Sequence, residues 1–484
     1  MRTETATTAG TPRTVVKENR RAGRARGAGA TVPVIDRRRG SAPGHGTSTL
    51  DELFGRVAAR RPGAVAVENG RHGITYEGAQ KRSGRLATAM LRSGVQLGDP
   101  VLVHCTDHVQ TLVAHLAVLK VGGVCVPVPG GADEGGRERA AAVSGAELVL
   151  CSGATRRGWP LPAIVLDDER TWARITPLHI DRSLPRSSAT DAAYLLVGRE
   201  PTAAPTGHLI DHRAWLLALA DRARRAGRAE SGVLCCQEPG DPDTLTSLWW
   251  AISAGGTLYD RQPAVDGAGR GRPMAVGRYT AAVFSPRAYA AVLADAAQRP
   301  TARLGTVVLV GEPCPRELVE RHFEALPYTK LLAEFAPVDG ALPWAAVEHS
   351  REDEPFRAEP PNTPPNTPPS ATPNAEPARA ELVRAGAPHP GRLVGSAVPR
   401  VRITVRDAAG RAVSSGTVGE IWASGAALPF DRLGVRGAGS GPVAGAPFAV
   451  SRYRGRWRED GLLEVTGGRA GGLVRTPERT AEAW

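Results

Sequence analysis

Lysine and aromatic residues are scarce in this chain of 484 residues. Only four lysines occur among 61 basic residues, so arginine carries nearly all of the positive side of a formal net charge of +12. Aromatic residues make up 5% of the chain, so valine, leucine and alanine must fill most of its core. Charge of this kind bears on solubility and non-specific binding rather than on fold. We interpret the arginine bias, together with abundant alanine, glycine and proline, as the mark of a GC-rich coding genome.

Long apolar runs and metal-type cysteine pairs are also missing. No run approaches the roughly 18 apolar residues of a membrane-spanning helix, and the N-terminus has no apolar stretch typical of a signal peptide. The six cysteines show no C-x-x-C spacing, which argues against zinc and favours buried, reduced thiols. The sequence therefore predicts a cytoplasmic protein with no membrane partner.

Two segments have the composition of unfolded chain. Residues 1–48 are rich in arginine, glycine and alanine without hydrophobic periodicity, which predicts a disordered basic arm. Such an arm could contact nucleic acid or an acidic protein, but it has no aromatic side chain to stack on bases, and a solvated tail is favoured. Residues 346–390 contain a proline-rich tandem repeat, which predicts a stiff solvated insertion, with a polyproline ligand as the alternative.

Between these segments, strands alternate with helices. We expect an amphipathic helix over 77–93, a buried strand over 100–104, a helix over 109–120 and a strand over 124–128. Thr49 is a plausible N-cap for a first helix. This alternation over residues 49–345 predicts an α/β fold with a largely parallel sheet. Short β-like runs predict a small β-rich subdomain over 391–475, before a tail over 476–484.

Six short segments occur in an order that resembles the adenylate-forming superfamily of AMP-dependent synthetases and ligases, and most of all the adenylation domains of nonribosomal peptide synthetases. They are residues 74–77, 119–127, 311–312, 331–339, 416–421 and 456–464. The resemblance spans about residues 48–475 apart from the proline-rich insertion. It implies a large N-terminal adenylation-type domain of layered parallel sheets and helices with a small β-rich subdomain. The family's C-terminal lid subdomain is expected to be absent, since no lysine follows Lys330.

The family's phosphate loop is altered in this chain. The family joins a carboxylate to the α-phosphorus of ATP, so its site must neutralise developing charge. Residues 193–207 align without a gap to A-Y-x-x-Y-T-S-G-S-T-G-x-P-K-G, and Thr202 and Gly207 are kept. However, Glu200 adds a negative charge, Pro201 removes a backbone donor, and Thr206 stands at the lysine position.

The nucleotide positions are partly kept. The resemblance implies that Gly311 and Glu312 contact adenine and that Phe335, in place of the family's tyrosine, offers a ring to it. Asp339 keeps a carboxylate that could bind Mg²⁺, whereas Val338 has lost the hydroxyl of the family's threonine. ATP and Mg²⁺ are the expected cofactors if any binding survives, and otherwise none is expected.

Three further family positions have changed. The ribose-binding T-G-D positions hold Ser451, Arg452 and Tyr453. Pro242 stands where the family's aspartate holds the substrate's amino group, and Asp241 or Asp243 could line the substrate pocket if the register shifts by one residue. The hinge motif G-R-A-D-D appears over 468–472 without its two carboxylates.

The sequence therefore favours a degenerate adenylation-domain-like protein that is catalytically impaired, with no catalytic residue assigned. It would act as a binding or scaffold component in nonribosomal peptide or related secondary-metabolite biosynthesis. Its partner would be an assembly-line or carrier protein, and nucleic acid is not expected. The alternative is an active ATP-dependent ligase that adenylates an amino or other small carboxylic acid.

Overall fold

A computed structural model describes residues 48–69, 72–181, 183–198, 205–227, 229, 232–260, 279–294, 304–338, 341–350, 392–434 and 448–468. The predicted basic arm, the proline-rich insertion and the tail lie outside these residues, except for residue 48 of the arm and residues 346–350 of the insertion. Thr202, Asp339 and the hinge positions after 468 also lie outside them.

Ten α-helices occur in the described part of the chain. They are α1 (Leu50–Arg60), α2 (Tyr76–Arg92), α3 (His108–Lys120), α4 (Glu134–Ser144), α5 (Gly153–Arg156), α6 (Glu169–Ile175), α7 (His212–Ala226), α8 (Pro242–Ala254), α9 (Pro286–Ala294) and α10 (Arg316–Ala325).

Twenty strands alternate with these helices and then follow one another. They are β1 (Val65–Glu68), β2 (Gly73–Thr75), β3 (Pro100–His104), β4 (Val124–Pro127), β5 (Val149–Cys151), β6 (Ala163–Val165), β7 (Ala192–Val197), β8 (Thr206–Asp211), β9 (Val233–Cys235), β10 (Leu258–Asp260), β11 (Ala281–Phe284), β12 (Thr306–Gly311), β13 (Lys330–Phe335), β14 (Ala345–His349), β15 (Arg392–Ala397), β16 (Val401–Arg406), β17 (Gly419–Gly425), β18 (Asp431–Gly434), β19 (Phe448–Trp457) and β20 (Leu463–Gly468).

Short polar side chains set several helix starts. Thr49 stands at the N-cap of α1, where the Glu52 carboxylate accepts a hydrogen bond from the Thr49 backbone N–H at 3.2 Å. Asp107 caps α3 by accepting from the backbone N–H groups of Val109 and Gln110. These contacts pair N–H groups that have no partner within the helix, and they confirm the predicted cap at Thr49.

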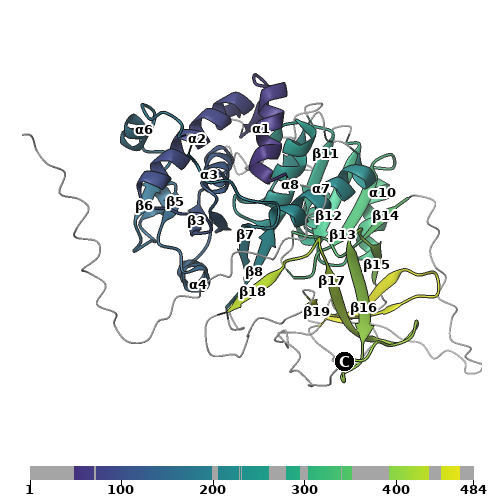
Figure 1. The fold of residues 1–484 in the computed structure, drawn as a ribbon. Helices are drawn as coiled ribbons and strands as arrows, with labels where there is room; N and C mark the ends of the chain where they lie inside the picture. The colour runs from purple at the N-terminus through teal and green to yellow at the C-terminus, as the bar shows by residue number, and fades with distance from the viewer. Residues whose placement is uncertain are drawn as a thin grey trace, which may run out of the picture. The chain divides into compact units, whose positions relative to one another are not determined.

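The strands form two sheets. The larger has the order β16-β17-β19-β20-β15-β14-β13-β12-β11-β9-β10-β1-β2, and the smaller has the order β18-β8-β7-β4-β3-β5-β6. Pairing is parallel from β1 through β10, β9, β11 and β12 to β13, and again from β6 through β5, β3 and β4 to β7. The predicted α/β fold with parallel sheets is thus confirmed (Figure 1).

The C-terminal strands continue the large sheet. β14 pairs antiparallel with β13 on one side and with β15 on the other. β15, β20, β19, β17 and β16 then pair antiparallel in turn. In Figure 1 the labelled strands β15, β16, β17 and β19 lie below β13 and β14. The β-rich part is therefore hydrogen-bonded directly to the α/β part through β14 and β15.

The few aromatic side chains are concentrated in the core. Trp215, Trp249, Trp250 and Trp344 are among the largest fully buried side chains. One apolar cluster joins both sheets with α1, α2, α3, α7 and α8, and its other members are mostly valine, leucine and alanine, as the composition predicts. A second cluster packs α9 and α10 on the other side chains of β11, β12 and β13.

Candidate functional site

Three residues that were predicted to contact the nucleotide lie together at the carboxyl ends of β12 and β13. Gly311 and Phe335 end these parallel strands and lie directly opposite each other, and the Ala336 N–H donates to the Gly311 carbonyl at 2.9 Å. Gly311 has φ of 100°, which favours glycine, and the exposed Glu312 follows it. Ligands of α/β sheets bind outside the carboxyl ends of strands, so this edge is the candidate site.

The ring of Phe335 is enclosed by other aromatic rings. Only 2% of Phe335 is exposed. Its ring centroid lies 5.4 Å from that of Tyr453, at an interplanar angle of 66°, and 6.4 Å from that of Trp344, at 78°. Tyr453 belongs to β19 and stands where the resemblance places the ribose-binding aspartate. A ring so deeply buried has no free face on which adenine could stack in this conformation.

A buried ion pair lies one residue before Phe335. Glu334 and Arg222 of α7 have side chains that are each 2% exposed. The Arg222 Nε donates to Glu334 Oε1 at 2.9 Å, and its terminal nitrogen donates to Oε2, so the contact is bidentate. Among the described residues of the segment 331–339, Glu334 carries the carboxylate. Arg222 already pairs with this carboxylate, so Glu334 does not fit the role of a Mg²⁺ ligand.

The altered phosphate loop connects two paired strands. β7 and β8 form an antiparallel hairpin in which Val197 lies opposite Gly207, and the Gly198 N–H donates to the Thr206 carbonyl at 2.8 Å. A Cβ atom on Gly207 would lie 2.7 Å from Leu195 Cδ1 and 2.8 Å from Val143 Cγ1. The described structure thus gives Gly207 a packing role within the small sheet.

The two predicted pocket aspartates lie at the start of α8. Asp241 is its N-cap residue, Pro242 its first residue, and Asp243 lies in its first turn. Both aspartates are half-buried, and the Asp243 carbonyl accepts from Ser247 Oγ at 2.8 Å. They are therefore close together at one helix end, as their spacing requires.

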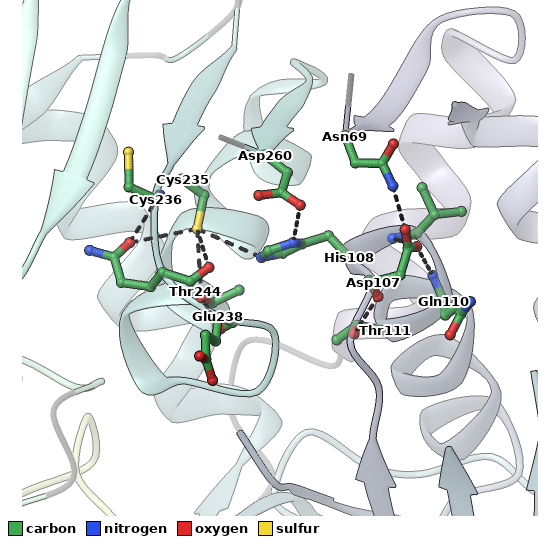
Figure 2. Close-up of polar contacts among 12 residues, drawn as sticks. Asn69, Asp107, His108, Gln110, Thr111, Cys235, Cys236, Glu238, Thr244 and Asp260 are labelled. Carbon is green, nitrogen blue, oxygen red and sulfur yellow. Dashed lines mark hydrogen bonds and ion pairs between the residues drawn. The ribbon is translucent and has the colours of Figure 1, made fainter. Parts of the chain in front are cut away.

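A buried polar cluster that the sequence did not predict lies beside this helix end (Figure 2). His108 Nδ1 lies 2.7 Å from Asp260 Oδ2, and its Nε2 lies 3.9 Å from Cys235 Sγ. Cys235 Sγ also lies 3.6 Å from Oγ1 of Thr244 in α8. Burial alone would lower the pKa of His108, but hydrogen bonds to Asp260 and Cys235 outweigh burial and raise that pKa from 6.5 to about 10.

Metal-type side-chain groups and membrane-spanning helices are both absent from the described residues. They contain no group of three or more histidine, cysteine, aspartate or glutamate side chains placed to hold a metal ion. No described helix is long and apolar enough to cross a membrane. Asp339, the predicted Mg²⁺ ligand, lies outside this part of the chain.

Comparison with known sequences gives related proteins. Residues 54–337 match the family model described as AMP-binding enzyme. The chain is 27% identical over 307 residues to tyrocidine synthase 3 of Brevibacillus parabrevis, a match that covers 61% of this chain and 5% of the synthase. It is 28% identical over 399 residues to novobiocin biosynthesis protein H of Streptomyces niveus, covering 79% of this chain and 58% of that protein. The chain thus matches less than two thirds of these relatives' lengths.

Comparison with solved structures gives the same fold. The N-terminal subdomain of Klebsiella oxytoca NpsA, solved in complex with 3-hydroxybenzoyl-AMSN, superposes with a TM-score of 0.64 at 18% identity and covers 87% of this chain and 100% of that one. The nonribosomal peptide synthetase FmoA3 superposes with a TM-score of 0.67 at 19% identity and covers 88% of this chain and 43% of that one. Since the family model spans more than half of the sequence, the chain belongs to the AMP-binding enzyme family and is related to nonribosomal peptide synthetases.

Proposed function

We propose that this protein is an adenylation-like protein that does not form acyl adenylates and serves as a binding or scaffold component of nonribosomal peptide or related biosynthesis. The observation that supports this most is the enclosure of Phe335 by Tyr453 and Trp344. In the family this position offers a ring to adenine, and here the ring packs on the protein itself.

The charges expected around ATP support the same proposal. Adenylation brings a carboxylate to a polyphosphate, so cations and aimed N–H donors must stabilise the transition state. Thr206 replaces the loop's lysine, and Tyr453 replaces the carboxylate that would hold the ribose hydroxyls. Val338 stands at the threonine of the family's threonine–glutamate pair, and its side chain has no oxygen for Mg²⁺. Each change removes a separate favourable contact with the nucleotide.

The relatives suggest the class of partner. Two relatives are named as a probable nonribosomal peptide synthetase and a tripeptide synthetase, and the solved structure of NpsA-ThdA is an artificially fused adenylation–PCP di-domain. A carrier protein or another assembly-line protein is therefore the partner that we propose for this chain.

Calorimetric titration with ATP·Mg²⁺, combined with ATP–pyrophosphate exchange over a panel of amino and aryl acids, tests the loss of adenylation. We expect no saturable heat up to about 1 mM nucleotide, the upper end of ordinary KM values, and no exchange. Saturable heat that Asp339→Ala removes, together with exchange for any acid, would establish the alternative of an active ligase.

Binding to purified carrier proteins encoded beside this chain, measured by interferometry, tests the scaffold role. We expect saturable binding to at least one carrier protein and none to an unrelated carrier. Absence of binding to all neighbouring assembly-line proteins would contradict that role, whatever the outcome with ATP.

A further inference from the structure

A thiol, an imidazole and a carboxylate lie in line in the polar cluster of Figure 2. Cys235 ends β9, Asp260 ends the neighbouring parallel strand β10, and His108 begins α3. Sγ of Cys235 lies 3.9 Å from Nε2 of His108, whose Nδ1 lies 2.7 Å from Oδ2 of Asp260. A nucleophile beside a base that a third group orients is the arrangement used in covalent catalysis.

The surroundings direct the imidazole toward the sulfur. Asp107, next to His108 in the chain, turns its carboxylate to Asn69 and to backbone N–H groups of α3. Asp260 and Cys235 are thus the titratable groups that hydrogen-bond the His108 ring among the described residues. An imidazolium held at Nδ1 by Asp260 presents its Nε2–H to the Cys235 sulfur, and the thiolate is the nucleophilic form of cysteine.

Gln237 contacts the sulfur and carries an unused donor. Its Oε1 lies 3.7 Å from Cys235 Sγ, and its buried Nε2 has no hydrogen-bond partner among the described residues. An unpaired buried donor costs about 1–3 kcal/mol. A half-turn of the amide, which exchanges its oxygen and nitrogen, would direct this donor toward the sulfur, where it would stabilise an oxyanion. Cys235 is fully buried, but Gln237 is half-buried next to the exposed Glu238. The acyl thioester would therefore approach the sulfur from the Gln237 side.

We propose that Cys235 is the nucleophile of a second site, which accepts the acyl group of a small acyl thioester. The Cys235 thiolate attacks the carbonyl carbon, and the Gln237 amide donates to the oxyanion. The bond to the leaving sulfur then breaks, and this sulfur takes the proton of His108 Nε2. One thioester replaces another, so the step needs no nucleotide and is independent of the function proposed above.

Incubation of the full chain with an acyl-N-acetylcysteamine thioester, followed by intact mass and peptide mapping, tests this proposal. We expect one added acyl group, located on Cys235 and released by hydroxylamine. Cys235→Ser should abolish the adduct, and His108→Gln should slow its formation by about 100-fold or more. Asp260 is a positioning residue, so Asp260→Asn should also change the pH dependence of the acylation rate.

The neighbouring cysteine provides the matched control. Cys236 is more exposed than Cys235, so simple chemical accessibility would place the adduct there. Cys236→Ser should acylate at the wild-type rate. An adduct mapped to Cys236 or to any other cysteine, or no adduct in wild-type protein that melts cooperatively, would overturn the proposal without requiring any variant to fold.

Discussion

The ring of Tyr453 lies edge-on against the ring of Phe335, with 5.4 Å between the two centroids. Tyr453 comes from the C-terminal antiparallel strands and Phe335 from the end of the parallel strands. The contact therefore joins the β-rich part to the predicted nucleotide edge. It links two family positions that would otherwise contact the ribose and the adenine of one nucleotide.

The Phe335–Tyr453 contact should be measurable as a coupling energy. Edge-to-face aromatic pairs contribute about 0.5–1.5 kcal/mol beyond their buried area. In a double-mutant cycle with Phe335→Leu and Tyr453→Leu, we expect a coupling of about 1 kcal/mol in urea unfolding. A coupling near zero would mean that the two rings do not stabilise each other in solution.

Gly207→Ala should reduce stability because its methyl group would meet Leu195 and Val143 at less than 3 Å. Overpacking of this kind costs about 1–3 kcal/mol, which thermal melting would detect. Gly198→Ala is the matched control in the same hairpin, since the nearest atom to its Cβ would be 3.5 Å away. Equal melting temperatures for the two variants would refute the packing role.

The Arg222–Glu334 pair should respond differently to single and double replacement. Removing one partner leaves an uncompensated buried charge and costs about 3–5 kcal/mol, whereas replacing both with apolar residues of similar size is often neutral. We expect Glu334→Leu alone to be strongly destabilising and Arg222→Met with Glu334→Leu to recover most of the loss in denaturant unfolding. Additive losses would contradict a paired buried contact.

Stability should fall as pH rises above neutrality because of His108. Its pKa is raised from 6.5 to about 10 in the folded protein, so the folded state holds a proton that the unfolded state releases. The favourable contribution is complete below pH 6.5 and is lost as pH rises to about 10, by at most about 1.4 kcal/mol per pH unit. Unfolding from pH 6 to 10 should show this slope, and His108→Gln should flatten it. The same slope in that variant would assign it to other groups.

Local structure was largely predictable from the sequence. The helix expected over 77–93 is Tyr76–Arg92, and the helix expected over 109–120 is His108–Lys120. Apolar periodicity and short polar caps act over a few neighbouring residues, which is why these elements could be predicted. The substitutions Thr206, Val338 and Tyr453 were also visible, because they follow from aligned motifs. The roles assigned to Thr202 and Asp339 stay predictions.

Long-range contacts were not predictable in this way. Cys235 and Asp260 lie 127 and 152 residues from His108 in the chain, and nothing in a single sequence indicates which helix start reaches which strand end. Likewise, Phe335 could be identified as an aromatic replacement, but not as a ring covered by Tyr453 and Trp344.

The sequence by itself determined the helices over 77–93 and 109–120, several strands of the parallel sheets and the family positions at which residues were replaced, because these depend on local periodicity and residue identity. Only the tertiary structure decided which replaced side chains pack together and which polar groups are buried. Burial depends on strands and helices far apart in the chain meeting in space, and burial determines whether an aromatic ring is open to a ligand and whether a histidine keeps its proton.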